Sequence, residues 1–183
     1  GVNGTPAGAT YTNSTTNAMS VATTASTPTG SYVYRVVATT VCGSINSNTD
    51  TIFVTTQPAV TDPTPTSQTV CANGAISAMS VTPSGGTGAY SYQWYSNTTS
   101  STTGGASIGG AISATYTPAP TATAGTTYYY CVVSQTGSGC GPVTTATTAS
   151  VTVNDLPSIS AQPLSTQTTC VGNTPTDLSV TTT

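Results

Sequence analysis

Most of the chain consists of short segments in which apolar and polar residues alternate, separated by Gly, Pro, Asn and Ser. A two-residue period places successive side chains on opposite faces of a β-strand. The clearest segment, residues 126–133, contains the alternating sets Tyr128, Tyr130, Val132 and Tyr129, Cys131, Val133. The other expected strands are residues 78–81, 90–95, 114–117 and 145–153, with a loop or weak edge at 98–110 and a turn at 137–139. Helical periodicity is missing, so the pattern predicts an all-β protein built as a β-sandwich.

The aromatic residues of this pattern divide into two groups. Trp94 shares one face of residues 90–95 with Tyr90 and Tyr92. A sandwich commonly buries a Trp at this central strand position, so we expect Trp94 in the core. The alternative is a platform on which sugars stack. Tyr95 and Tyr129 have the opposite parity and are expected to form an exposed aromatic pair.

The sequence repeats itself with a period of about 99 residues. SQTVC at residues 67–71 returns as TQTTC 99 positions later, and VTV at 151–153 corresponds to Ile52 and Val54. SYVYRVV at 31–37 matches TYYYCVV at 127–133. Such a period indicates a tandem array of similar domains. We expect the C-terminal part of a first repeat (1–57), a complete repeat (58–154) and the N-terminal part of a third (155–183).

The charged residues are few: one Arg and four Asp, with no His. A surface almost without cations cannot neutralise a phosphate backbone, so nucleic acid is not expected as a partner. No run of 18 apolar residues is present, so membrane insertion is not expected. Isolated aspartates seldom supply the six or more oxygens of a calcium site. We therefore expect no metal, no cofactor and no catalytic residues, and solvated loop carboxylates at Asp50, Asp62, Asp155 and Asp177.

Five cysteines without a CxxC spacing suggest disulfides in an oxidising compartment. Cys42 and Cys140 occupy equivalent positions in the repeat, as do Cys71 and Cys170. The economical assignment is a Cys71–Cys140 disulfide within the complete repeat, with partners outside the chain for Cys42 and Cys170. Cys131 aligns with Arg35, which suits an outer face or a domain junction. Cys131 is expected to be a free thiol or to form a disulfide with a neighbouring domain or chain.

Several short motifs together resemble one family of repeats. They are Val70-Cys71, YQWY at 92–95, TTYYY at 126–130, GCG at 139–141 and VTV at 151–153. This combination resembles the immunoglobulin-like repeats of very long cell-surface proteins of the Bacteroidota, including SprB-like gliding-motility adhesins and other cargo of the type IX secretion system. The resemblance implies tandem immunoglobulin-like β-sandwiches that form an extracellular stalk or filament on a bacterial surface. The implied partners are neighbouring repeats, other filament chains and surface polysaccharide.

The same resemblance draws attention to Asp50-Thr51-Ile52, which is similar to the Asp-Thr-aliphatic pattern of O-glycosylation sites in the Bacteroidota. Ile52 and Val54 should face the core, so Thr51 should face solvent as a glycan requires. A chance match in a Thr-rich chain is the alternative. Sequons for N-glycosylation begin at Asn3, Asn13 and Asn97, and we give them little weight.

The sequence thus predicts a non-enzymatic structural region of a filamentous adhesin that serves surface adhesion or gliding. Two alternatives remain. The chain could be a subunit of a non-covalent fibre whose incomplete domains are completed by strand exchange. It could also be the stalk of a large secreted hydrolase.

Overall fold

The computed structural model describes residues 6–12, 15, 18–137, 139–163 and 165–182. Every element of regular structure in these residues is a β-strand, which confirms the predicted all-β class. The strands are β1 (Thr10–Thr12), β2 (Ser20–Ala22), β3 (Gly30–Tyr34), β4 (Val37–Thr40), β5 (Gly43–Asn46), β6 (Asp50–Val54), β7 (Ala59–Val60), β8 (Ser67–Cys71), β9 (Met79–Ser80), β10 (Pro83–Ser84), β11 (Tyr90–Asn97), β12 (Ala106–Ser107), β13 (Thr115–Tyr116), β14 (Gly125–Gln135), β15 (Val143–Thr144), β16 (Ala149–Asn154), β17 (Ile159–Ala161) and β18 (Thr181–Thr182).

The contacts along the chain define two compact units, which are described separately below. The first comprises Gly1–Ala59, Pro83–Ser91 and Val133–Val143. The second comprises Val60–Thr82, Tyr92–Val132 and Thr144–Thr183.

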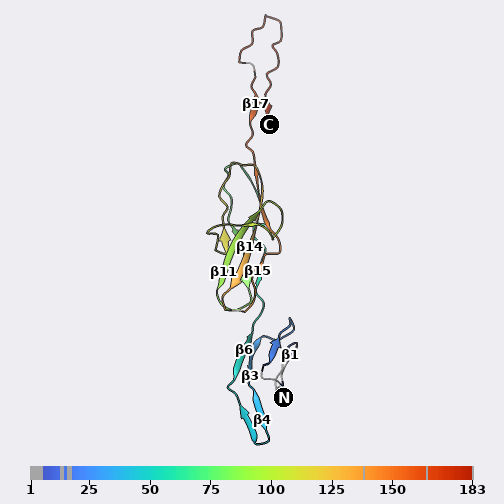
Figure 1. Ribbon diagram of the computed structural model, residues 1–183. Coiled ribbons are helices and arrows are strands. Elements are labelled where there is room, and N and C mark those ends of the chain that lie inside the picture. Colours follow the sequence, from blue (N-terminus) through green and yellow to red (C-terminus); the bar gives the residue numbers. More distant parts are fainter. Residues whose placement is uncertain (1–5, 13–14, 16–17, 138, 164, 183) are drawn as a thin grey trace. The chain divides into compact units, whose positions relative to one another are not determined.

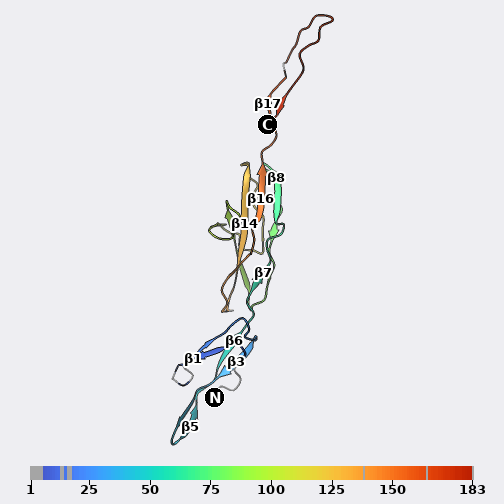
Figure 2. The same cartoon turned by 90° about the vertical axis from the view of Figure 1, so that its right-hand side faces the viewer.

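The largest sheet has the strand order β12-β11-β14-β16-β8, and β15 also pairs with β14. Figure 2 shows β14, β16 and β8 side by side. β14 and β16 are antiparallel, with Gly125 opposite Val153. β8 joins the other edge of β16 in parallel, from Ser67 opposite Ser150 to Cys71 opposite Asn154. A second, smaller sheet pairs β13 with β9, so the arrangement is consistent with a β-sandwich.

The core lies on the inner face of the large sheet. The buried apolar residues of the described chain, of which Tyr130 lies on the outer face, are Ile76, Met79, Val81, Trp94, Ala111, Tyr129, Tyr130, Cys131, Val133, Ala149, Val151 and Val153. Trp94 is fully buried, as predicted. Its indole N–H donates to the carbonyl oxygen of Ser113 at 2.9 Å, and its ring lies 5.9 Å from that of Tyr116. Burial of the largest side chain together with its polar atom identifies Trp94 as the centre of the core.

The tyrosines of β14 point to the faces opposite to those predicted. Tyr129, Cys131 and Val133 form the inner set, so the expected exposed pair of Tyr95 with Tyr129 is wrong. Tyr129 instead packs against Tyr116 at 5.9 Å between ring centroids. On the outer face Tyr95 stacks on Tyr130 at 5.0 Å, with the rings 6° from parallel. Both faces of β14 carry tyrosines, so alternation alone could not distinguish inside from outside.

Residues 30–54 form a smaller set of strands, with β3 antiparallel to β6 and β4 antiparallel to β5. Figure 1 shows β3 and β6 as neighbours. Gly30 lies opposite Val54, as Gly125 lies opposite Val153 in the large sheet. Ile52 and Val54 are only half-buried here, and Phe53 is 73% exposed.

The C-terminal residues contain a further short antiparallel pair, β17 with β18; elsewhere β1 pairs with β2 and β7 with β10. The register of β17 with β18 shifts between Ile159 and Ala161. Residues 165–170, which carry the TQTTC motif, belong to no strand in the structure. Leu178 and Val180, which the repeat aligns with core residues, are exposed.

Candidate functional site

Cys131 lies inside the sandwich. Its residue exposure is 0%, and its backbone N–H lies 3.5 Å from Thr145 Oγ1. Burial raises the pKa of the thiol from 9.0 to about 11, partly opposed by a hydrogen bond from the Gln93 backbone. The prediction of an outer-face or junction position is therefore wrong. A thiol held neutral in the core cannot reach another chain while the domain is folded.

The register of the strand pairs explains this error. Counting from Gly30 and Gly125, which lie opposite Val54 and Val153, places Val36 in the position of Cys131. Arg35, which follows the end of β3 at Tyr34, then takes the position of Tyr130; both Arg35 and Val36 are exposed. The registers therefore differ by one residue from the match of 31–37 with 127–133, and a one-residue shift in a strand exchanges its two faces.

The expected Cys71–Cys140 disulfide is absent from the structure. Cys71 ends β8 at the edge where β14 begins, opposite Asn154. Cys140 follows the other end of β14, which is 11 residues long. A strand of that length spans roughly 35 Å. The Cα atoms of a disulfide are within about 7 Å of each other, and the structure forms no such bond at Cys71 or Cys140.

Cys140 lies next to the two residues that follow β6, Thr55 and Thr56. Its Sγ lies 3.8 Å from Thr55 Oγ1 and 4.0 Å from the carbonyl oxygen of Thr56. Cys42 is exposed in the turn between β4 and β5, where its N–H donates to Thr40 Oγ1 at 3.2 Å. Cys71 and Cys170 are exposed thiols. The partners predicted outside the chain for Cys42 and Cys170 stay predictions.

Thr51, the candidate glycosylation site, lies in β6 opposite Val33. It is half-buried, and its backbone N–H donates to Asp50 Oδ1 at 2.9 Å. Its side chain shares a face with the exposed Phe53, so this face of β6 is accessible. Glycosylation of Thr51 stays a prediction.

The N-glycosylation sequons differ in what the structure says of them. Asn3 and Asn13 lie outside the described residues. The amide of Asn97 donates to the carbonyl oxygens of Ser101 and Thr103 at 3.2 and 3.1 Å. These bonds engage the nitrogen that a glycan would occupy.

The aspartates do not come together. Within the residues that the structure describes, no three His, Cys, Asp or Glu side chains form a group that could hold a metal ion. Asp62 accepts a hydrogen bond from the Thr147 backbone N–H at 2.9 Å, which lowers the pKa of its carboxyl. Asp62 therefore fixes a loop, whereas Asp50, Asp155 and Asp177 are exposed.

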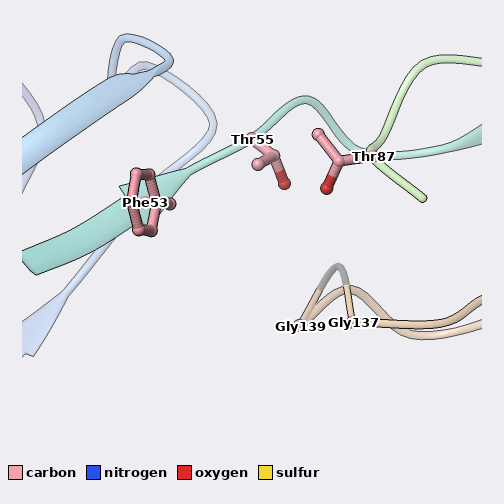
Figure 3. A pocket seen from close by; sticks show the side chains of 5 residues that line it. All are labelled: Phe53, Thr55, Thr87, Gly137 and Gly139. Carbon is pink, nitrogen blue, oxygen red and sulfur yellow. The ribbon is translucent and has the colours of Figure 1, made fainter.

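Two open hollows carry hydroxyl groups and no charged side chains. The larger, about 500 Å³, is lined by Phe53, Thr55, Thr87, Gly137 and Gly139 (Figure 3). The side chains in Figure 3 offer one aromatic ring and two hydroxyls. The second, about 340 Å³, is lined by residues 100–102 and 146–148, where Ser100 and Thr148 hydroxyls lie 3.2 Å apart. Such linings supply hydrogen bonds but no titratable group for acid–base chemistry.

The part of the chain that the structure describes contains no candidate membrane-spanning helix. No curated protein matches the chain, and no solved structure matches it. One family model matches residues 61–155, which is more than half of the 183 residues. The matched segment contains β8, β11, β14 and β16, the main strands of the large sheet. The chain therefore belongs to the family described as "Domain of unknown function (DUF8696)".

Proposed function

We propose that the chain is a structural repeat region of an extracellular filamentous adhesin, in which β-sandwiches of about 99 residues are joined in series. The observation that carries this proposal is a hydrogen-bonded unit that recurs at the sequence period. The side-chain amide of Gln68 donates to the carbonyl oxygen of Ser77 at 3.0 Å. The amide of Gln167 donates to that of Thr176, 99 residues later, also at 3.0 Å.

The turns beside these glutamines also recur. The carbonyl oxygen of Cys71 accepts from the Gly74 N–H at 2.7 Å, and that of Cys170 accepts from the Asn173 N–H at 3.1 Å. Cys71 and Gly74 are shifted by the same 99 positions to Cys170 and Asn173. The same backbone turn, 99 residues apart, supports two copies of the N-terminal part of one domain.

A recurring tyrosine pair supports two copies of the C-terminal part of the domain. The rings of Tyr11 and Tyr34 lie 6.1 Å apart at 53°, and those of Tyr116 and Tyr129 lie 5.9 Å apart at 47°. Tyr34 and Tyr129 occupy the same place in the two strand registers. The family match at 61–155 spans about one period, nearly the segment delimited by the repeat.

The chemistry of the surface is consistent with a mechanical role outside the cell. Only five charged residues occur in the chain, and Ser and Thr hydroxyls are its commonest polar side-chain groups. The resemblance to adhesins of the Bacteroidota adds the setting: a cell-surface stalk, secreted by the type IX system, that serves adhesion or gliding. Its partners would be neighbouring repeats, other filament chains and surface polysaccharide.

Surface labelling tests this proposal. Antibodies raised against residues 58–154 should label intact cells, and external protease should remove the signal. On a reducing denaturing gel the band should run well above the 18.0 kDa of this chain. Labelling only after permeabilisation would contradict an extracellular filament. A catalytic module in the same polypeptide would instead favour the stalk of a secreted hydrolase.

A further inference from the structure

Two cysteine positions recur in this chain, each within a recurring local structure. Cys71 and Cys170 lie 99 residues apart, and the carbonyl oxygen of each accepts a hydrogen bond from the N–H three residues later. Cys42 and Cys140 each lie between two strands that pair with each other, β4 with β5 and β14 with β15. The complete repeat therefore carries one cysteine of each kind. We call them the β8 cysteine (Cys71, Cys170) and the hairpin cysteine (Cys42, Cys140).

The hairpin cysteine of the complete repeat lies against the end of the repeat before it. Cys140 Sγ is 3.8 Å from Thr55 Oγ1 and 4.0 Å from the carbonyl oxygen of Thr56, the two residues that follow β6. A second loop of the complete repeat holds the same connection, because the Gly86 N–H donates to Thr56 Oγ1 at 2.9 Å. A hairpin cysteine therefore lies beside the residue that follows the last valine of the preceding repeat's final strand.

The β8 cysteine lies beside the counterpart of that same residue. β6 and β16 occupy the same place in two strand registers, each with its last valine opposite a glycine, so Thr55 corresponds to Asn154. Cys71 is the residue opposite Asn154 in the parallel pair of β8 with β16. The Ala72 N–H donates to the Asn154 carbonyl oxygen at 2.8 Å, which holds the two strand ends together. One position at the end of a repeat is therefore next to both kinds of cysteine: the β8 cysteine of its own repeat and the hairpin cysteine of the repeat that follows.

The spacing at this position suits a disulfide. Neighbouring strands lie about 4.7–4.9 Å apart, and residues opposite each other point to the same face. A β8 cysteine is therefore about one strand spacing from the residue opposite it, and a hairpin sulfur is 3.8 Å from the side chain at the equivalent position. The Cα atoms of a disulfide are up to about 7 Å apart, so two cysteines that contact one residue are within reach of each other.

We infer that the β8 cysteine of each repeat forms a disulfide with the hairpin cysteine of the repeat that follows. Cys71 then pairs with the hairpin cysteine of the third repeat, and Cys140 pairs with the β8 cysteine of the first. Both of these partners lie outside residues 1–183. Cys131, which is buried in the core, takes no part. The inference rests on the proposed series of repeats and adds how successive repeats are joined covalently.

The bond has a defined chemistry and a mechanical consequence. The two thiols lose two protons and two electrons as their sulfurs join, and a disulfide-bearing oxidant accepts both and becomes two thiols. The loop that each bond closes runs from one β8 cysteine to the hairpin cysteine of the next repeat, which is longer than the 99-residue period. Consecutive loops therefore overlap, and every backbone segment of the series is bypassed by at least one disulfide.

The native full-length protein tests the pairing. The purified protein is treated with oxidised glutathione, its remaining thiols are blocked with N-ethylmaleimide, and its peptic peptides are analysed by mass spectrometry. The Cys71 peptide should be linked to the hairpin peptide of the following repeat, and the Cys140 peptide to the β8 peptide of the preceding one. Because oxidation comes first, the result does not depend on where the cell keeps the protein. A link between Cys71 and Cys140, or no link between repeats, would overturn the inference.

Two variants of the full-length protein locate the partner. Cys71→Ser should release one thiol for labelling, in the hairpin of the following repeat, and should leave Cys140 linked. Pairing inside one sandwich predicts the release of Cys140 instead. Cys131→Ser is the matched control and should release no other thiol, because the Cys131 side chain is enclosed in the core.

The contact on which the inference depends is tested in the 183-residue chain itself. With the three exposed cysteines replaced by Ser, Thr55→Cys should form an intramolecular disulfide with Cys140 in oxidised glutathione. It should do so at least about tenfold faster than Thr51→Cys. Thr51 is the matched control, because it is a threonine of β6 that lies four residues, about 13 Å, further back. Equal rates would overturn the position of the hairpin cysteine and the inference with it.

The outcomes separate this inference from the proposed function. A full-length protein without further repeats would remove both. A Cys71–Cys140 link in a protein of many repeats would overturn the disulfide inference alone and leave the series of sandwiches in place.

Discussion

Tyr95 stacks on Tyr130 across the outer face of the large sheet, with ring centroids 5.0 Å apart and planes 6° from parallel. The hydroxyl of Tyr130 accepts a hydrogen bond from the Gly105 N–H at 3.2 Å. The loop at Gly105 therefore closes over the ring, and this cover explains why an outer-face tyrosine is buried. Aromatic packing of this kind adds about 0.5–1.5 kcal/mol beyond the area buried.

Replacing Gly105 should disturb that cover. A Cβ at Gly105 would lie 2.7 Å from the Ser96 carbonyl oxygen and 2.8 Å from Tyr130 Cε1. Gly105→Ala should lower the free energy of unfolding by about 1–3 kcal/mol, measured by urea denaturation. Gly109→Ala is the matched control, because a Cβ there meets nothing within 4 Å. Equal stabilities of the two variants would show that the loop does not pack on Tyr130.

The centre of the core gives a second prediction. Trp94→Ala removes the largest buried side chain and should lower the free energy of unfolding by about 3–5 kcal/mol. Trp94→Phe keeps most of the volume but leaves the Ser113 carbonyl oxygen without its donor, which costs about 1–3 kcal/mol. Circular dichroism during denaturation measures both. A loss below about 1 kcal/mol for Trp94→Ala would place the core elsewhere.

The buried thiol should make stability depend on alkaline pH. Because burial raises the pKa of Cys131 from 9.0 to about 11, the unfolded chain loses this proton before the folded chain does. The stabilisation is complete below about pH 9 and declines as pH rises through about 11, by at most about 3 kcal/mol. Wild type should therefore lose more stability than Cys131→Ala over this window. Parallel pH profiles for the two proteins would contradict the burial of Cys131.

Thiol labelling checks the same residue more directly. At neutral pH, iodoacetamide should modify the exposed Cys42, Cys71 and Cys170 of the folded chain and spare Cys131 until denaturant is added. Peptide mass spectrometry reads the sites. Rapid labelling of Cys131 under native conditions would mean that the sandwich is open at β14.

The lowered pKa of Asp62 should make stability depend on acidic pH. Its lowered pKa means that the carboxylate stabilises the folded chain at neutral pH, and this contribution is lost as pH falls below about 4 through the folded pKa. Asp62→Asn should flatten the acid limb of the stability profile, and Asp155→Asn, at an exposed position, should leave it unchanged. Thermal melts at several acidic pH values make the comparison. Identical profiles for the two variants would remove the role of the Thr147 hydrogen bond.

The strands and the central tryptophan could be predicted from the sequence because two-residue alternation reports them directly. The same signal does not say which face is inside. In β14 tyrosines occupy both faces, and only the packing of Tyr129 on Tyr116 and of Tyr130 under Gly105 distinguishes them. The burial of Cys131 follows from that choice, so it could not be predicted.

The disulfide assignment failed for a different reason. Repeat positions identified which cysteines are equivalent but not which ends of the sheet they occupy. That depends on β8, which is difficult to predict as a strand because Ser67, Gln68 and Thr69 give it little apolar alternation. The parallel pairing of β8 with β16 places Cys71 opposite Asn154, whereas Cys140 lies near Thr55.

The central claim is a series of similar sandwiches, and stretching single molecules of the native protein under reducing conditions tests it most directly. A domain of about 99 residues releases roughly 300 Å of chain when it unfolds, at no more than 3.3–3.6 Å per residue. The account predicts a long series of unfolding events with this even spacing. One or two events, or increments without a common length, would contradict it.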